Sequence, residues 1–451
     1  MKFGRKRIAW PASLVIVLAV MVGVAVSSAS ARTERATATL RTMGFGLPDE
    51  IAKVRVEEAK KAVGTGNDFQ MDTGGFDEQK FLSAVASGNP PDLIYMDRQL
   101  IGTYANRGAL QPLTNCIRSQ RINMSQYRDA ARREVTFKGV VYGIPEFVQN
   151  RNIIVNRPVL ANAKVKLTDI DTSNWAKLAA ANRKLLKRSG GKVTRIGFDP
   201  KLPEFFPLWA KANGVDILSK DGRHAHINNP RAIAALTYAV SLINAHGGWG
   251  PFKSFRDTWD FFGAKNQVQQ GQVGAWPMED FYYNNLARNS PGVKIYVKMF
   301  ESRRGVPIDY ATGNTWAIPR GAKNPTQACI WMKAMTRWET WIKAADARKA
   351  ARKAQNLPFL PLYTGNKTAD QRIFNRVWEA SATSPYFRQA VRTNLRSQRF
   401  AFSIPPSPAG AEFHKAWEDA VNRVLARQQG VKAALDQAQK EAQRALDRAR
   451  N

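Results

Sequence analysis

Hydrophobic and polar positions along this chain follow two different periods in turn. Strands are predicted where apolar residues alternate or form short β-branched runs, at 37–43, 92–96, 193–198, 272–276, 293–299 and 315–319. Helices are predicted where apolar residues recur every three or four positions, at 49–58, 77–88, 173–186, 229–245, 325–341 and 411–446, the last range divided near Gly430. Because strand and helix signals keep alternating, we predict an α/β fold.

One helix-turn-strand unit also suggests where a ligand binds. Asp77 opens its helix, Gly88 ends it, and the strand at 92–96 follows a turn that contains two prolines. Asp97 comes directly after this strand. Open α/β sheets bind ligands at the carboxyl ends of their strands, so Asp97 is predicted to face a ligand.

Residues 1–31 have the pattern of an export signal. Four basic residues precede an apolar stretch at 14–26, and Ala29-Ser30-Ala31 forms an A-x-A cleavage site. An uncleaved anchor is the alternative, because no charge lies between Arg7 and Arg32. No cysteine lies near the end of the apolar stretch, which excludes a lipid anchor there. In both cases we expect the bulk of the chain outside the cytoplasm.

Length and charge narrow the class of protein further. A chain of 451 residues with 44% hydrophobic residues suits two domains with substantial cores. The net charge of +32 would suit a nucleic acid or an anionic surface as partner. Lys and Arg are scattered among aromatic residues and glycines, however, and an exported protein rarely meets nucleic acid. We therefore predict no nucleic-acid partner and keep attraction to an anionic envelope as an alternative.

The sequence offers little for metal binding or catalysis. Two cysteines are too few for a structural zinc site, and His224 and His226 have no third ligand nearby in the sequence. We find no nucleophile elbow, phosphate loop or dinucleotide fingerprint. Glu279 and Asp280 could suggest glycoside hydrolysis, but adjacent residues of a strand point to opposite faces. We predict no metal, no cofactor and no enzymatic activity.

Several segments, in order along the chain, resemble a known family. They are GGFDEQKFLSAVASGNPPDLIYMD (74–97), GALQPLTN (108–115), KGVVYGIPEF (138–147), IIVNRPVL (153–160), GQVGAWPMEDFYYN (271–284), GNTWAIPRGAKNPTQA (313–328) and ALDQAQKEAQRAL (434–446). Their succession is similar to that in family 1 extracellular solute-binding proteins, the maltose-binding-protein-like sugar receptors. The chain departs from the family in lacking a lipid-anchoring cysteine and in the basic runs at 124–133 and 343–353, which leave the charge of the ligand open.

The resemblance implies a two-lobe, type II periplasmic-binding-protein-like fold. Lobe one would comprise 36–147 and 312–375, and lobe two 148–311 and 376–451, joined by crossover strands with the ligand cleft between them. Cys116 and Cys329 would then share lobe one, so we expect a disulfide, although their spacing alone cannot show that they meet. The closed form of such a protein, a monomer, is what the permease of an ABC importer recognises.

A sugar offers hydroxyl groups and flat C–H faces, and a site for it needs carboxylates or amides together with aromatic rings. Residues of these types at predicted strand ends and loops are the candidate ligand contacts: Phe45, Phe76, Asp97, Glu146, Trp209, Trp276, Glu279, Trp316 and Tyr363. Each has a structural alternative, such as core packing for the tryptophans and a hinge or cap role for the acids. The predicted function is capture of a sugar or related polyol for an ABC importer. An envelope-associated adhesion protein and a glycoside-acting enzyme are the alternatives.

Overall fold

A computed structural model describes residues 39–64 and 66–449 of the chain. The export segment predicted at 1–31 lies outside the described residues. Among the helices of the described ranges, none has both the length and the apolar character that crossing a membrane requires.

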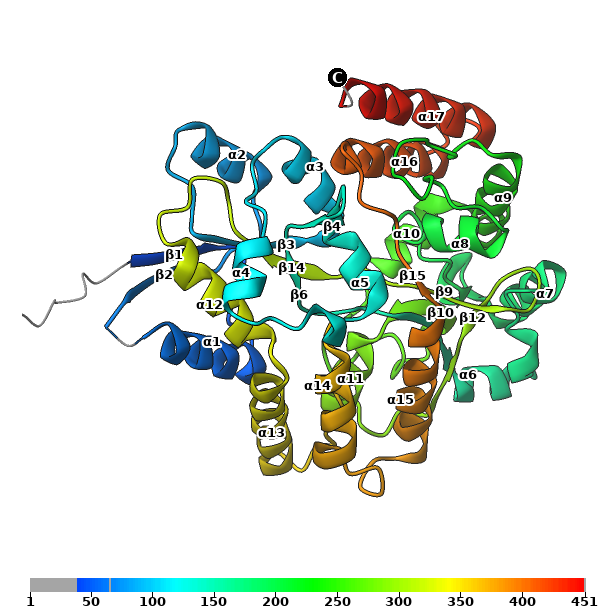
Figure 1. The fold of residues 1–451 in the computed structure, drawn as a ribbon. Helices are drawn as coiled ribbons and strands as arrows, with labels where there is room; N and C mark the ends of the chain where they lie inside the picture. The colour runs from blue at the N-terminus through cyan, green and yellow to red at the C-terminus, as the bar shows by residue number, and fades with distance from the viewer. Residues whose placement is uncertain (1–38, 65, 450–451) are drawn as a thin grey trace, which may run out of the picture. The chain divides into compact units, whose positions relative to one another are not determined.

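Within the described residues, the first of two five-stranded sheets has the order β2-β1-β3-β14-β6 (Figure 1). Its strands are β1 (Thr39–Met43), β2 (Asp68–Asp72), β3 (Leu93–Asp97), β6 (Ile144–Pro145) and β14 (Asn314–Ala317). Strand β1 pairs in parallel with β2 and β3, whereas β14 runs antiparallel to β3 and β6. The last strand to join this sheet therefore comes from more than 160 residues further along the chain than β6.

The second sheet has the order β11-β7-β10-β9-β8. Its strands are β7 (Arg151–Asn156), β8 (Lys187–Ser189), β9 (Lys192–Phe198), β10 (Val273–Glu279) and β11 (Ile295–Lys298). Smaller sheets are formed by β4 (Thr136–Phe137) with β5 (Val140–Val141), and by β12 (Phe300–Glu301), β13 (Pro307–Tyr310) and β15 (Ala401–Phe402). The chain thus builds four strands of the first sheet, then the whole second sheet, and returns to the first with β14.

Helices connect and cover the strands. Those before β7 are α1 (Glu50–Val63), α2 (Glu78–Ala86), α3 (Ile101–Asn106), α4 (Thr114–Ser119) and α5 (Asp129–Glu134). Those between β7 and β14 are α6 (Arg157–Asn162), α7 (Trp175–Leu185), α8 (Phe206–Ala212), α9 (Pro230–Asn244), α10 (Trp249–Arg256) and α11 (Phe281–Asn289). Those after β14 are α12 (Pro325–Thr336), α13 (Trp338–Ala354), α14 (Lys367–Arg372), α15 (Pro385–Ser397), α16 (Gly410–Leu425) and α17 (Val431–Arg448).

Side-chain caps begin several helices where the sequence predicts a start. Asp49 accepts a hydrogen bond from the backbone N–H of Ala52 at 2.9 Å, and Asp77 accepts one from Lys80 at 2.9 Å. Each cap satisfies an N–H group that has no partner inside the helix. The predicted α/β alternation is confirmed, and the helix that begins at Asp49 continues to Val63, beyond the predicted end at 58.

Two predicted boundaries are wrong. The single helix predicted over 325–341 is two helices, α12 and α13, because Arg337 between them has an extended backbone with φ −68° and ψ 150°. The strand predicted to end before Pro277 continues to Glu279 as β10. Proline is tolerated there because β9 pairs with β10 only as far as Ala275, so no neighbour requires an N–H from Pro277 on that side.

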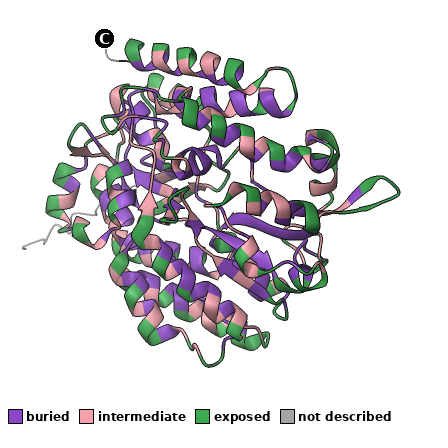
Figure 2. Cartoon of the chain, turned by 90° about the vertical axis from the view of Figure 1, so that its right-hand side faces the viewer, coloured by how far each residue is buried: buried purple, intermediate pink, exposed green. Residues whose placement is uncertain are grey.

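The cores lie between the sheets and their helices. Figure 2 shows the strands largely buried, whereas many outer helices carry buried and exposed stripes. On the side of the first sheet, α1 packs against both α12 and α13. The larger apolar cluster surrounds the second sheet, and its fully buried tryptophans include Trp209, Trp276 and Trp417.

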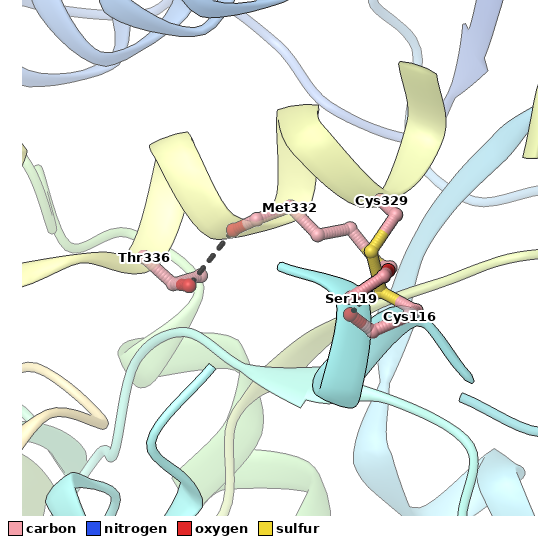
Figure 3. The surroundings of a disulfide bond; sticks show 5 residues. All are labelled: Cys116, Ser119, Cys329, Met332 and Thr336. Atoms are coloured by element: carbon pink, nitrogen blue, oxygen red, sulfur yellow. Dashed lines mark hydrogen bonds between the residues drawn. A yellow bond between two sulfur atoms is a disulfide. The ribbon is translucent and has the colours of Figure 1, made fainter. Parts of the chain in front are cut away.

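A disulfide bond joins Cys116 on α4 to Cys329 on α12 (Figure 3). The two Cα atoms lie 5.6 Å apart across a sequence separation of 213 residues. Both side chains are buried in the apolar cluster that also holds Trp316 and Trp331. The bond therefore ties an early helix to a late one on the same side of the first sheet.

Two segments connect the sheets and lie side by side. Residues 146–150 leave β6 for β7, residues 311–313 return from β13 to β14, and Gln149 and Thr312 form an antiparallel bridge between them. Beside them Asp309 is fully buried and accepts hydrogen bonds from Asn150 Nδ2 and the Arg151 backbone N–H, both at 2.7 Å. A buried hydrogen-bonded network therefore holds the crossover.

A buried ion pair near the crossover makes stability depend on pH. Arg98 Nε donates to Glu134 Oε2 at 2.8 Å, and the two side chains are 0% and 1% exposed. Burial raises the pKa of Glu134 from 4.5 to about 7, and the charge of Arg98 offsets burial only in part. A carboxyl group whose pKa is raised by folding stabilises the fold while it is protonated. That contribution is lost as pH rises from the unfolded pKa through the folded one.

We therefore compare the free energy of unfolding of wild type with that of Glu134→Gln. Between about pH 4.5 and about pH 8, the value for wild type should fall by about 3 kcal/mol relative to the value for the variant. Glutamine keeps the shape of the carboxyl group and cannot ionise. Urea unfolding of both proteins across this range measures the difference. Glu57→Gln, at an exposed position, serves as the control and should run parallel to wild type. Parallel curves for Glu134→Gln and wild type would show that Glu134 ionises as easily in the folded state as in the unfolded one.

Candidate ligand-binding cavity

A cavity of about 730 Å³ opens between residues that accompany the two sheets. On the side of the first sheet, the wall is formed by the loop 45–49 after β1 and by parts of α1 and α13. Single residues complete it: Tyr95, the crossover residues Phe147 and Gln149, Leu362 and Tyr363. On the side of the second sheet its wall comprises Phe262, Asp280 and four residues of α11. The volume lies within the range of small-molecule sites in proteins, about 300–1,000 Å³.

Aromatic rings form one wall. Phe45 meets Tyr95 edge-on, with ring centroids 5.0 Å apart and planes at 90°. Behind them, the ring of Trp316 lies 5.0 Å from both. This packing holds Phe45 and Tyr95 in fixed orientations at the cavity surface, as a stacking platform requires.

A buried arginine completes this wall. Arg55 Nη1 lies 2.9 Å from Glu146 Oε1, and the side chains are 1% and 0% exposed. The guanidinium group also lies over the Trp341 ring at 4.1 Å from its centroid. Glu146 in turn accepts hydrogen bonds from Tyr95 Oη, at 3.1 Å, and from Trp316 Nε1. One carboxylate therefore positions three side chains at or behind the cavity wall.

The opposite wall presents two phenyl rings to solvent. The side chain of Phe262 is 63% exposed and that of Phe281 is 37% exposed. Their centroids are 6.3 Å apart with an interplanar angle of 25°. Beside them, on α11, lie the amide side chains of Asn284 and Asn285. Exposed phenyl rings facing a cavity, with amides alongside, suit a ligand with both apolar faces and hydroxyl groups.

Asp280 lies at the inner end of this wall and is 3% exposed. Its Oδ2 accepts hydrogen bonds from the Asn150 backbone N–H at 3.1 Å and from Asn394 Nδ2 at 3.2 Å. Burial raises the pKa of Asp280 well above its usual range, and the neighbouring charge of Asp309 adds to the effect. This carboxyl group therefore carries less negative charge near neutral pH than an exposed aspartate would.

Four of the residues predicted as ligand contacts come together here. Phe45 and Tyr363 line the cavity. Glu146 and Trp316 lie directly behind its wall, fully buried and hydrogen-bonded to each other. Direct contact of these four residues with a ligand stays a prediction. Glu146 contacts Arg55 and Tyr95 of the cavity wall, and Trp316 packs on Tyr95.

Two predicted tryptophans do not line this cavity. Trp209 was expected in a loop but lies within α8, fully buried, where its Nε1 donates to the Pro200 carbonyl at 2.9 Å. Trp276 is fully buried in the middle of β10. Residues 273–278 of this central strand are all buried, so side chains on both faces of the sheet enter the core.

The remaining three predicted residues have local structural partners instead. Phe76 packs on Phe81 and Tyr104, with centroids 5.5 and 6.0 Å away. Asp97, at the end of β3, is exposed and its side chain caps the next turn by accepting from the Gln99 N–H at 3.0 Å. Glu279 pairs with Arg151 at 3.4 Å. A cap and an ion pair thus occupy the carboxylates of Asp97 and Glu279, and neither residue lines the cavity.

Sequence reasoning missed Arg55, Phe262 and Phe281. Arg55 lies within a basic and acidic helix, where a charge ordinarily indicates a solvated face. The Phe261-Phe262-Gly263 run was a usable signal for an exposed aromatic turn. Their common surface depends on how α1 and α11 approach each other across the cavity.

The sequence model of the family described as bacterial extracellular solute-binding protein matches residues 57–340, well over half of the chain. The chain belongs to this family. This solute-binding protein is therefore an exported protein, and its family and fold neighbours are binding proteins.

Solved structures with the same two-lobe fold cover nearly the whole chain. CpMnBP1 with mannotriose bound matches with a TM-score of 0.72 at 22% identity, over 90% of this solute-binding protein and 100% of that chain. MalE from Bdellovibrio bacteriovorus bound to maltotriose matches with a TM-score of 0.68 at 16% identity, over 91% and 100%. Among curated proteins, diacetylchitobiose binding protein DasA of Streptomyces coelicolor is 24% identical over 130 residues. That match spans 29% of this chain and 30% of DasA.

Proposed function

We propose that this solute-binding protein captures a sugar, an oligosaccharide or a related polyol, in the cavity and delivers it to an ABC importer. The observation that carries the proposal is the exposed pair Phe262 and Phe281, which faces the rings of Phe45 and Tyr95 across a cavity of about 730 Å³. Aromatic faces on both sides suit the C–H faces of sugar rings. The fold neighbours bound to mannotriose and maltotriose, and a relative named for diacetylchitobiose, support the same ligand class.

Delivery follows from closure of two lobes. Residues 36–147 with 312–375 would form one lobe and 148–311 with 376–451 the other, moving about the crossover segments. A ligand that contacts both walls favours the closed state over the open one, and the permease then recognises that state. The protein acts as a monomer, in the periplasm or at the outer face of the cytoplasmic membrane, with residues 1–31 cleaved or retained as an anchor.

A sugar panel tests the proposal. Ligand binding to the folded state raises the melting temperature, so a sugar that binds should shift it in a concentration-dependent way. Phe262→Ala should weaken the binding of that sugar about 3- to 10-fold by calorimetric titration, because one stacking ring is lost. Phe400→Ala is the matched control, since Phe400 is also exposed, at 40%, but does not line the cavity.

Other outcomes distinguish the alternatives. A protein that no sugar stabilises, but that binds polyanions in a salt-sensitive way, would be an envelope-adhesion protein rather than a sugar receptor. Hydrolysis of a glycoside without stable binding would indicate an enzyme. Equal weakening by Phe262→Ala and Phe400→Ala would place the sugar outside this cavity.

A further inference from the structure

Three arginine side chains beyond Arg55 line the cavity, and they differ in how well their charges are matched. Arg348 on α13 has carboxylate partners in Asp49 and Glu50, the latter with Arg348 Nε 2.5 Å from Glu50 Oε1. Arg288, on α11, approaches from the opposite wall. Arg352 follows Arg348 by one helical turn on the same face of α13.

Arg352 is the unusual member of this group. Its side chain is only 7% exposed, yet within the described residues its guanidinium group makes no hydrogen bond and no ion pair. Its guanidinium nitrogens keep contact with the solvent of the cavity, so an acceptor for them has to come from the cavity side. Because Arg352 lines the cavity without an acceptor from the chain, its N–H donors are available to a ligand that carries one.

Arg288 adds a second positive charge from the other side. No ion pair joins its guanidinium group to the carboxylates of residues 39–64 and 66–449. Burial, and then the positive charges of Arg348 and Arg288, lower the pKa of Arg352, against the opposing pull of Glu50 and Asp49. Arg288, which is exposed, and Arg352 thus lie within electrostatic reach of each other on opposite walls of the cavity.

The carboxyl groups of the cavity are already engaged. Glu146 pairs with Arg55, Asp49 and Glu50 pair with Arg348, and Asp280 accepts two buried hydrogen bonds. Asp49 and Glu50 together carry two negative charges against the one positive charge of Arg348, and both also act on Arg352, so a single positive charge is left unbalanced between Arg288 and Arg352. An anion placed between them would bind both guanidinium groups and convert their repulsion into attraction across the two walls.

We propose that the sugar carries an anionic substituent, a carboxylate, sulfate or phosphate, held between Arg288 and Arg352. This inference rests on the proposed function and specifies the substrate class of the same cavity. The aromatic rings of both walls bind the sugar faces, while the two arginines select the charged group and couple its binding to closure. Guanidinium groups suit this role because they present planar, paired donors to oxyanions.

The test compares acidic sugars with neutral counterparts of the same linkage. Probes are oligomers of galacturonate, glucuronate and mannuronate, each with its carboxyl-reduced form, and neutral disaccharides with and without one sulfate or phosphate group. Calorimetric titration of wild type should show at least about tenfold tighter binding of one acidic probe than of its neutral counterpart. That preference should fall as salt concentration rises.

Variants make the assignment specific. Arg352→Gln and Arg288→Gln should each weaken binding of the acidic probe by about tenfold or more, and leave binding of the neutral one unchanged or slightly tighter. Lys353→Gln is the matched control, because it removes a positive charge from an exposed neighbouring position on α13 that does not line the cavity. It should change neither affinity.

Each result separates this inference from the proposed function. Neutral sugars could bind as tightly as their acidic counterparts, or Arg352→Gln could weaken the binding of both kinds of sugar equally. In either case the inference of an anionic substituent is wrong, while the proposed capture of a sugar stands. If no probe of either kind binds, sugar capture fails and this inference fails with it. If the acidic probe binds but Lys353→Gln weakens it as much as Arg352→Gln does, the preference comes from general surface charge, and the two arginines do not hold the anion.

Discussion

Glu146→Gln lowers the free energy of unfolding by about 3–5 kcal/mol, as is typical when one partner of a buried ion pair is removed. The Arg55 guanidinium group then remains buried, at 1% exposure, with aromatic faces around it but no negative charge. Glutamine can still accept a hydrogen bond from Tyr95 or Trp316. The loss of stability therefore comes mainly from the loss of the negative charge beside Arg55. Urea unfolding at neutral pH measures it.

A double variant separates charge from shape. Arg55→Met with Glu146→Gln removes both charges, and we expect it to be more stable than Glu146→Gln alone. Glu379→Ala is a control for an ordinary ion pair, because Glu379 is 61% exposed and pairs with Lys349 at the surface. Its free energy of unfolding should stay close to that of wild type. A double variant less stable than the single one would mean that Arg55 contributes chiefly through packing.

The same substitution should also impair ligand binding. Glu146 positions Arg55, Tyr95 and Trp316, and two of these side chains form cavity wall. We therefore expect weaker binding of any sugar that wild type binds, measured at a temperature where the variant is still folded. Unchanged affinity would show that this wall tolerates reorientation of Tyr95.

Loss of the disulfide has an effect of similar size. Cys116→Ala with Cys329→Ala should lower the free energy of unfolding by about 4 kcal/mol, because the bond closes a loop across a sequence separation of 213 residues and so restricts the unfolded chain. When a reductant is present during unfolding, the free energy of unfolding of wild type should fall by a comparable amount, whereas that of the double variant should not change. A variant as stable as wild type, with no response of wild type to reductant, would show that the bond does not form in the exported protein.

Much of the fold could be predicted because its signals are local. Caps such as Asp49 and Asp77, and breakers such as Gly88, act over a few residues, so they are visible in the sequence. The split between α12 and α13 was not visible, because the backbone change at Arg337 interrupts a continuous helical pattern without a glycine or proline.

The candidate cavity was predictable only in part. Phe45 and Tyr363 line the cavity, as their predicted places at a strand end and in a loop suggested, and their contact with a ligand stays a prediction. Trp209 and Trp276 were misplaced because a large aromatic side chain looks the same in sequence whether it packs in a core or faces a ligand.

By itself the sequence determined the α/β class, the export signal pattern, the family and the two cysteines available for a bond. Periodicity, caps and ordered motifs express these properties over short distances along the chain. Only the tertiary structure decided that α1 and α13 meet α11 across one cavity, that Glu146 pairs with Arg55, and that Arg288 and Arg352 face it without carboxylate partners of their own. Such relations depend on long-range packing, which brings together residues as far apart along the chain as Asp49 and Arg348 and leaves no local pattern.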